Sequence, residues 1–157
     1  MGFAALVLAA GPGLCQPISP ERLAEVLHRS PVPVVVNVWA TWCRPCVEEF
    51  PEILAFAREQ GSRIKLVLLS ADFSSRRELV DAFLRQHGVD VVTFLKDGAD
   101  EAFINVLSPQ WTGSLPATFV FAPGGKLVAF FERKITKSEL EQALASLPKS
   151  PPKGGKP

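Results

Sequence analysis

The chain has 157 residues, enough for one domain, and 47% of them are hydrophobic, which suffices for one core. Its 17 basic and 16 acidic residues leave a formal net charge of +1, which excludes the electrostatic footprint typical of nucleic-acid-binding or anionic-membrane-binding proteins. The chain has no internal repeat, and no stretch approaches the roughly 18–20 apolar residues that a transmembrane helix needs.

The first ten residues form a short apolar run that is similar to the hydrophobic region of a secretory signal peptide. No Lys or Arg occurs before Arg22, so the basic segment that normally opens such a signal is missing. We therefore expect residues 1–15 to be either a signal peptide or an apolar N-terminus, with an N-terminal strand as the alternative. Cys15 ends this segment, and we expect it to be removed by cleavage or to be an inert thiol, with lipidation as the alternative.

Hydrophobic periodicity and turn residues predict alternating helices and strands over residues 16–147, which we expect to form one domain. The predicted helices span residues 20–29, 44–60, 74–87, 99–107 and 136–147. The predicted strands span residues 32–40, 64–70, 89–95, 117–122 and 126–132. Candidate N-caps are polar residues at the helix starts: Ser19, Ser74 or Ser75, and Thr136 or Ser138. The tail 148–157 contains only Pro, Lys, Gly and Ser, which predicts disorder.

The order of these elements predicts the fold class. Residues 32–40 are a continuous apolar run bounded by prolines, as expected for a central strand that is buried on both faces. From this strand onward the order is βαβαβαββα, and Pro123-Gly124-Gly125 predicts a hairpin between the last two strands. The sequence therefore predicts an α/β fold with a mixed central sheet flanked by helices on both faces.

The motif that carries chemistry is Trp42-Cys43-Arg44-Pro45-Cys46, directly after the predicted central strand. A helix is predicted to begin here, and its N-terminus presents unpaired N–H groups and a partial positive charge that favour a thiolate over a thiol. Cys43 at the helix start is the expected nucleophile, and Cys46, one turn in, is the expected resolving thiol. A structural disulfide and half of a metal site are the alternatives, although a zinc site needs two further ligands and the chain has no second CxxC.

The segment Asn37–Pro51, NVWATWCRPCVEEFP, resembles the thioredoxin superfamily and, more narrowly, its TlpA/ResA-like branch of exported thiol–disulfide oxidoreductases. A second match is Ser114–Val120, SLPATFV, which resembles the family's loop that carries a cis-proline beside the dithiol. The resemblance covers residues 20–147 and implies a thioredoxin-like fold. It also implies a redox-active pair in which Cys43 is the exposed nucleophile and Cys46 resolves the mixed disulfide.

The resemblance assigns roles to further residues. Glu49 aligns with a buried acidic residue that tunes the dithiol and relays protons, the alternative being a helix first-turn acid that complements the dipole. Pro116 is the implied cis residue, and the Leu115 backbone would pair with an extended substrate strand. Trp42 is expected to shield the dithiol and to contact substrate. Asn37 stands where thioredoxin has a buried Asp, which argues against an ordinary cytosolic thioredoxin.

These features predict an enzyme, a thiol–disulfide oxidoreductase that reduces exported proteins, and the resemblance implies substrates such as apocytochrome c or copper-site assembly proteins. No flavin or nucleotide signature is present, so we expect no cofactor and no metal, and electrons must come from a partner, typically a membrane reductant carrier. We expect a monomer that is periplasmic or otherwise extracytoplasmic, either free or membrane-tethered. The alternatives are a disulfide donor, which Arg44 favours by stabilising the thiolate, a peroxidase, and a metallochaperone or binding module.

Overall fold

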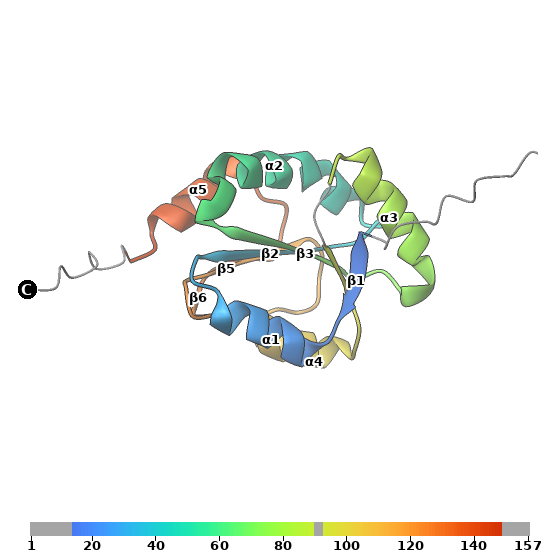
Figure 1. The fold of residues 1–157 in the computed structure, drawn as a ribbon, viewed down its shortest axis with the longest axis horizontal. Coiled ribbons are helices and arrows are strands. Elements are labelled where there is room, and N and C mark those ends of the chain that lie inside the picture. The colour runs from blue at the N-terminus through green and yellow to red at the C-terminus, as the bar shows by residue number, and fades with distance from the viewer. Residues whose placement is uncertain (1–13, 90–92, 149–157) are drawn as a thin grey trace, which may run out of the picture.

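A computed structural model of the chain describes residues 14–89 and 93–148. Six strands form one sheet in the order β1–β4–β3–β2–β5–β6, with helices on both faces (Figure 1). The strands are β1 (Cys15–Ile18), β2 (Val34–Trp39), β3 (Lys65–Ser70), β4 (Thr93–Lys96), β5 (Ala117–Phe121) and β6 (Leu127–Phe131). The helices are α1 (Pro20–Arg29), α2 (Arg44–Gln60), α3 (Arg77–Gln86), α4 (Asp100–Leu107) and α5 (Lys137–Ala145). The predicted α/β fold with a mixed sheet is confirmed.

The sheet brings several strand ends to one edge. β1, β4, β3 and β2 run parallel, whereas β5 and β6 are antiparallel to their neighbours. The carboxyl ends of β2, β3 and β4 therefore lie at the same edge as the amino end of β5. Open α/β sheets place their functional sites at this carboxyl edge.

Helices α2, α3 and α5 cover one face of the sheet, and α1 and α4 cover the other (Figure 1). Two apolar cores follow from this layering, one containing Phe50 of α2 and the other containing Phe103 of α4. Successive strand residues point to opposite faces, so β2 contributes to both cores. Val35 and Trp39 belong to the core under α2, which places Asn37 on the same face of β2.

Two predicted helix caps are confirmed and one is wrong. The Ser19 side chain accepts a hydrogen bond from the Arg22 N–H, and Thr136 forms a capping box with Glu139. Neither Ser74 nor Ser75 caps α3 by its side chain, because residues 74–76 form a short 3₁₀ turn and α3 begins only at Arg77. No helix within the described ranges is both long and apolar enough to cross a membrane.

Strand β1 was not predicted. It pairs in parallel with β4 at the edge of the sheet, and the Cys15 N–H donates a 2.7 Å hydrogen bond to the buried Asp81 carboxylate. Cys15 thus belongs to the sheet rather than to the apolar segment before it. Its burial raises the pKa of the thiol to about 11, which agrees with an inert thiol. The described residues leave out 1–13 of the signal peptide or apolar N-terminus expected at 1–15, part of the strand expected at 89–95, and the tail from 149.

Candidate active site

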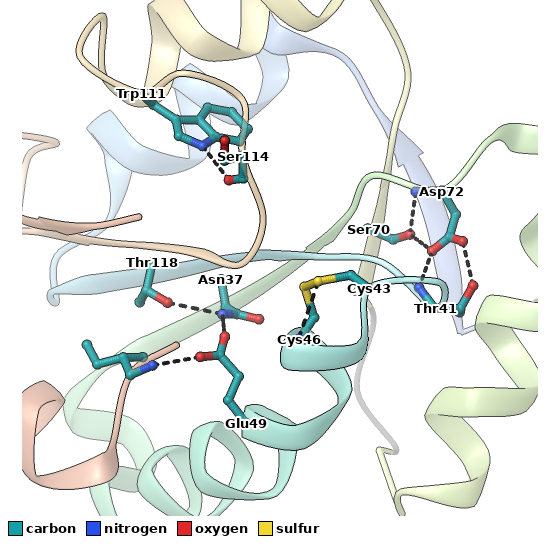
Figure 2. Close-up of a disulfide and its surroundings, with 11 residues drawn as sticks. Asn37, Thr41, Cys43, Cys46, Glu49, Ser70, Asp72, Trp111, Ser114 and Thr118 are labelled. Carbon is teal, nitrogen blue, oxygen red and sulfur yellow. Dashed lines mark hydrogen bonds between the residues drawn. A yellow bond between two sulfur atoms is a disulfide. The ribbon is translucent and has the colours of Figure 1, made fainter. Parts of the chain in front are cut away.

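The two cysteines of the motif lie at the start of α2, at the carboxyl edge of the sheet (Figure 2). β2 ends at Trp39, and the Cys43 N–H donates a 3.1 Å hydrogen bond to the Ala40 carbonyl, which closes the turn between strand and helix. Cys43 is the N-cap of α2 and forms a disulfide with Cys46, with the two Cα atoms 5.3 Å apart. Strand, turn, disulfide and helix are therefore arranged as the motif predicts.

The disulfide is better buried than the sequence suggests. Cys43 retains 6% of its surface and Cys46 none, so the order of accessibility is as expected although Cys43 is not exposed in this oxidised state. The Cys43 Sγ accepts a 3.3 Å hydrogen bond from the Cys46 N–H. This is the N-terminal donor that would stabilise a thiolate at Cys43 after reduction.

Glu49 lies one turn after Cys46 on α2 and is only 2% exposed. One carboxylate oxygen accepts from the Asn37 amide at 2.9 Å, and the other accepts from the Ile135 backbone N–H at 2.8 Å. Burial raises the pKa of this carboxyl above its usual range, and the two hydrogen bonds and Lys134 only partly offset that effect. A carboxyl of this kind can take up or release a proton near neutral pH more readily than an exposed one.

Asn37 links this carboxylate to the next strand. It is fully buried, and its Nδ2 donates both to Glu49 and, at 3.1 Å, to the Thr118 hydroxyl of β5 (Figure 2). Its Oδ1 has no hydrogen-bond partner within the part of the chain that the structure describes. An Asn can serve Glu49 in either protonation state, because its amide carries both donors and an acceptor.

A second buried carboxylate, Asp72, holds the turn that precedes the disulfide. Asp72 follows β3 and accepts hydrogen bonds from the Thr41 N–H at 2.9 Å and the Thr41 hydroxyl at 2.6 Å. The Ser70 hydroxyl donates to the same carboxylate at 2.8 Å (Figure 2). Sequence reasoning missed this residue, because its partner is 31 positions away and only the parallel pairing of β2 and β3 brings the two together.

The proline loop completes the site from β5. The Leu115–Pro116 bond is cis, as the resemblance implies. The register pairs Val38 of β2 with Ala117, so Pro116 enters β5 beside the strand that leads to the disulfide. Leu115 is half-buried and Pro116 is buried.

A groove of about 580 Å³ lies beside the motif. Of the three predicted substrate residues, Trp42 and Leu115 line this groove, whereas the buried Pro116 does not. Trp42 keeps 62% of its surface exposed and Phe73, another lining residue, 75%. Trp42 therefore faces solvent at the rim of the groove. Two large apolar side chains are therefore exposed at this groove, and exposed apolar surface of this kind is typical of interaction sites.

The model of the Redoxin family matches residues 14–144, most of the chain and nearly all of its described part. The chain belongs to the Redoxin family. This Redoxin-family chain is 29% identical over 117 residues to the thiol-disulfide oxidoreductase ResA of Geobacillus thermodenitrificans, which covers 73% of the chain and 62% of that relative. It thus spans less than two thirds of the length of the curated relatives it matches.

Solved structures share the fold. A DsbF homologue from Corynebacterium diphtheriae superposes with a TM-score of 0.68 at 21% identity, covering 78% of this chain and 76% of that one. A thioredoxin-related protein from Neisseria meningitidis serogroup B gives 0.62 at 27% identity, covering 74% and 84%. The predicted thioredoxin-like fold is confirmed.

Arg44, the positive charge between the two cysteines of this Redoxin-family site, forms an ion pair with Glu48. Arg44 is exposed, and its Nε lies 3.1 Å from a Glu48 carboxylate oxygen. The other oxygen of Glu48 lies 3.1 Å from the Lys134 ammonium. The Glu48 carboxylate therefore partly neutralises the positive charge of Arg44. This weakens the stabilisation of a Cys43 thiolate that the position of Arg44 in the sequence suggests. No group of three or more His, Cys, Asp or Glu side chains within residues 14–89 and 93–148 is arranged to hold a metal ion.

Proposed function

We propose that this protein is a thiol–disulfide oxidoreductase that reduces disulfides in protein substrates through the Cys43–Cys46 pair. The observation that carries the proposal is the disulfide at the N-terminus of α2, in which the Cys43 sulfur already accepts a helix N–H. Membership of the Redoxin family and 29% identity to a thiol-disulfide oxidoreductase support the same activity.

In the reducing direction, the Cys43 thiolate attacks one sulfur of the substrate disulfide. The substrate S–S bond breaks, a mixed disulfide to Cys43 forms, and the other substrate sulfur leaves as a thiolate that takes up a proton. Cys46 then loses its proton and attacks the Cys43 sulfur, which forms the Cys43–Cys46 disulfide and releases the second substrate thiolate. Two electrons have passed from the dithiol to the substrate.

Glu49 is proposed to take the proton from Cys46 in the resolving step. The two residues are three apart on α2 and both are buried, so solvent cannot easily serve as the base there. The raised pKa of Glu49 suits a group that must be charged before the step and neutral after it. Asn37 and the Ile135 N–H hold the carboxylate in place for this transfer.

The substrate is proposed to bind along the groove between Trp42 and the proline loop. An extended segment beside the substrate cysteine would pair with the Leu115 backbone next to Pro116, and its side chains would contact the exposed faces of Trp42 and Phe73. Main-chain pairing would allow many disulfide-containing proteins as substrates, including the apocytochrome c and copper-site assembly proteins that the resemblance implies.

We propose an extracytoplasmic location and re-reduction by a membrane reductant carrier, on the strength of the resemblance to exported thiol–disulfide oxidoreductases. A reductant is needed because the Cys43–Cys46 disulfide must be reduced again after each turnover. Cell fractionation would test the location. Trapping of a carrier protein by the Cys46→Ser variant would test the partner.

The deciding experiment is the redox potential of the Cys43–Cys46 pair in glutathione and dithiothreitol buffers, together with insulin reduction by the wild type and by Cys43→Ser and Cys46→Ser. A potential near the thioredoxin value of about −270 mV supports a reductase. A value near about −120 mV makes the protein a disulfide donor instead. If no reversible disulfide forms, the oxidoreductase proposal fails and metal binding becomes the leading alternative, to be tested by anaerobic titration with Cu(I) and Zn(II).

A further inference from the structure

A third carboxylate, Glu132, holds the loop that leads into the cis-proline. Glu132 follows β6, and one of its carboxylate oxygens accepts from the Thr112 N–H at 3.0 Å and from the Ser114 N–H at 3.3 Å. The Thr112 hydroxyl donates to the same oxygen and lies 3.0 Å from the Ser114 hydroxyl. Three loop groups therefore donate to one side chain that is 18–20 positions away in the sequence.

The backbone of this loop is shaped to receive an anion. Two N–H groups, separated by one residue, converge on a single oxygen, which is the arrangement of a backbone anion nest. Gly113 lies between them with φ +88°, a left-handed conformation that favours glycine. Without the carboxylate, these exposed donors would return to water and the loop would lose its tie to β6. The two apolar cores would stay intact, because neither contains any of the four residues involved, which are Thr112, Gly113, Ser114 and Glu132.

The same loop is one wall of the groove beside the disulfide. Trp111, Gly113 and Leu115 line the groove, and the Trp111 ring nitrogen donates a 2.9 Å hydrogen bond to the Ser114 carbonyl (Figure 2). Hydrogen bonds within the loop and to Glu132 thus tie residues 111–115 into one segment. Because Ser114 is bonded directly to Leu115, the hydrogen bond from the Ser114 N–H to Glu132 also restricts the backbone conformation at Leu115.

We propose that Glu132 is a positioning residue for substrate binding, which presets the 111–115 loop so that the Leu115 backbone is ready to pair with an extended segment of a protein disulfide. Glu132 touches neither sulfur, so it acts on binding of the peptide strand and not on the exchange step. A preset loop loses less conformational freedom when the strand pairs with it. The inference rests on the proposed function and deepens it by assigning a source of selectivity for extended protein substrates over small disulfides.

The test compares insulin and hydroxyethyl disulfide as substrates for the wild type, Glu132→Ala and Glu132→Gln. The matched carboxylate control is Glu25→Gln on α1, because Glu25 is likewise half-buried and does not line the groove. Loss of charge-assisted hydrogen bonds at a half-buried site is expected to raise KM for insulin roughly tenfold in Glu132→Ala. Glu132→Gln keeps an acceptor oxygen and is expected to raise it about two- to threefold. KM for the small disulfide and the redox potential are expected to stay near wild type, because neither depends on strand pairing.

Two further measurements keep the outcome clear. Thr112→Val removes the hydroxyl donor with little change of shape, and its effect on KM for insulin should largely disappear in the Glu132→Ala background. Hydrogen exchange of the Thr112 and Ser114 amides should speed up in Glu132→Ala. If the wild type reduces insulin and Glu132→Ala does so with an unchanged KM, or if both substrates and the potential change together, the inference is overturned. If the wild type leaves insulin intact, the proposed function itself fails.

Discussion

Replacing Glu49 by Leu is expected to destabilise the oxidised protein by about 2–4 kcal/mol, because two buried donors lose a charged acceptor. The Ile135 N–H loses its 2.8 Å partner, which costs about 1–3 kcal/mol. The Asn37 amide keeps its 3.1 Å contact with Thr118, so its share is smaller, about 1 kcal/mol. Leu fills most of the volume, so the added cavity cost is small. Glu49→Gln keeps an acceptor oxygen and is expected to change stability by less than about 1 kcal/mol at low pH.

The comparison between Glu49→Gln and wild type also depends on pH. Because burial raises the pKa of Glu49 in the folded state, the folded protein binds this proton more tightly than the unfolded chain does. The stability that protonated Glu49 contributes is therefore fully present below the unfolded pKa of about 4.3 and is lost as the pH rises to the folded pKa. Gln does not titrate, so the variant should gain stability relative to wild type across this window and keep a constant advantage above it.

Urea unfolding of the oxidised proteins between about pH 4 and pH 8 measures both effects, with the midpoint and slope fitted at each pH. Glu141→Leu and Glu141→Gln are suitable controls, since Glu141 is exposed on α5 and its one ion pair among the described residues is a 3.8 Å contact with Lys137. If Glu49→Leu is as stable as wild type, the carboxylate does not hold these donors. If the difference between Glu49→Gln and wild type is the same at every pH, burial does not raise the pKa of Glu49.

Three further outcomes are expected. Asp72→Asn keeps one acceptor oxygen but replaces the other by an NH2 group that faces one of the two Thr41 donors, so urea unfolding should show a loss of about 1–3 kcal/mol; an unchanged midpoint would mean that the turn is held by other contacts. Native Cys15 should react slowly with iodoacetamide, and its rate should rise with pH toward about 11, whereas rapid modification at neutral pH would show that β1 opens readily. Glu48→Gln should free the charge of Arg44 and raise the redox potential by about 10 mV, as read from glutathione equilibria; a lower potential would refute the pairing argument.

The sequence predicted the parts of the site that depend on neighbours along the chain. The apolar run at 32–40, the CxxC that follows it and the helix after that share one local pattern, and all three lie where the pattern indicates. The caps at Ser19 and Thr136 are local in the same way. Edge strand β1 has only four residues and includes Pro17, so it carries no alternating pattern from which a strand could be predicted.

The carboxylates differ in the same way, because only one of them could be predicted from its neighbours in the sequence. Glu49 could be singled out because it shares a helix face with Cys46, but its partners on β2 and before α5 depend on how the sheet and α5 pack. Asp72 and Glu132 have no distinguishing neighbour in the sequence. Each meets its hydrogen-bond partners only when strand pairing brings a distant loop against it, so spacing alone could not have found either one.

The redox potential of the dithiol depends on the charges and hydrogen-bond donors around Cys43, whose positions are given by the structure and not by the sequence. Arg44 between the cysteines favours a thiolate and hence oxidant character, but Glu48 pairs with it and offsets this charge. The Cys46 N–H, in contrast, is directed at the Cys43 sulfur at the N-terminus of α2, is shielded from water, and has no competing partner among the described contacts. The buried carboxylate of Glu49 acts in the opposite sense, since a negative charge near the dithiol disfavours a second one. We therefore expect the helix N-terminus and Glu49, rather than Arg44, to set the redox potential of this dithiol.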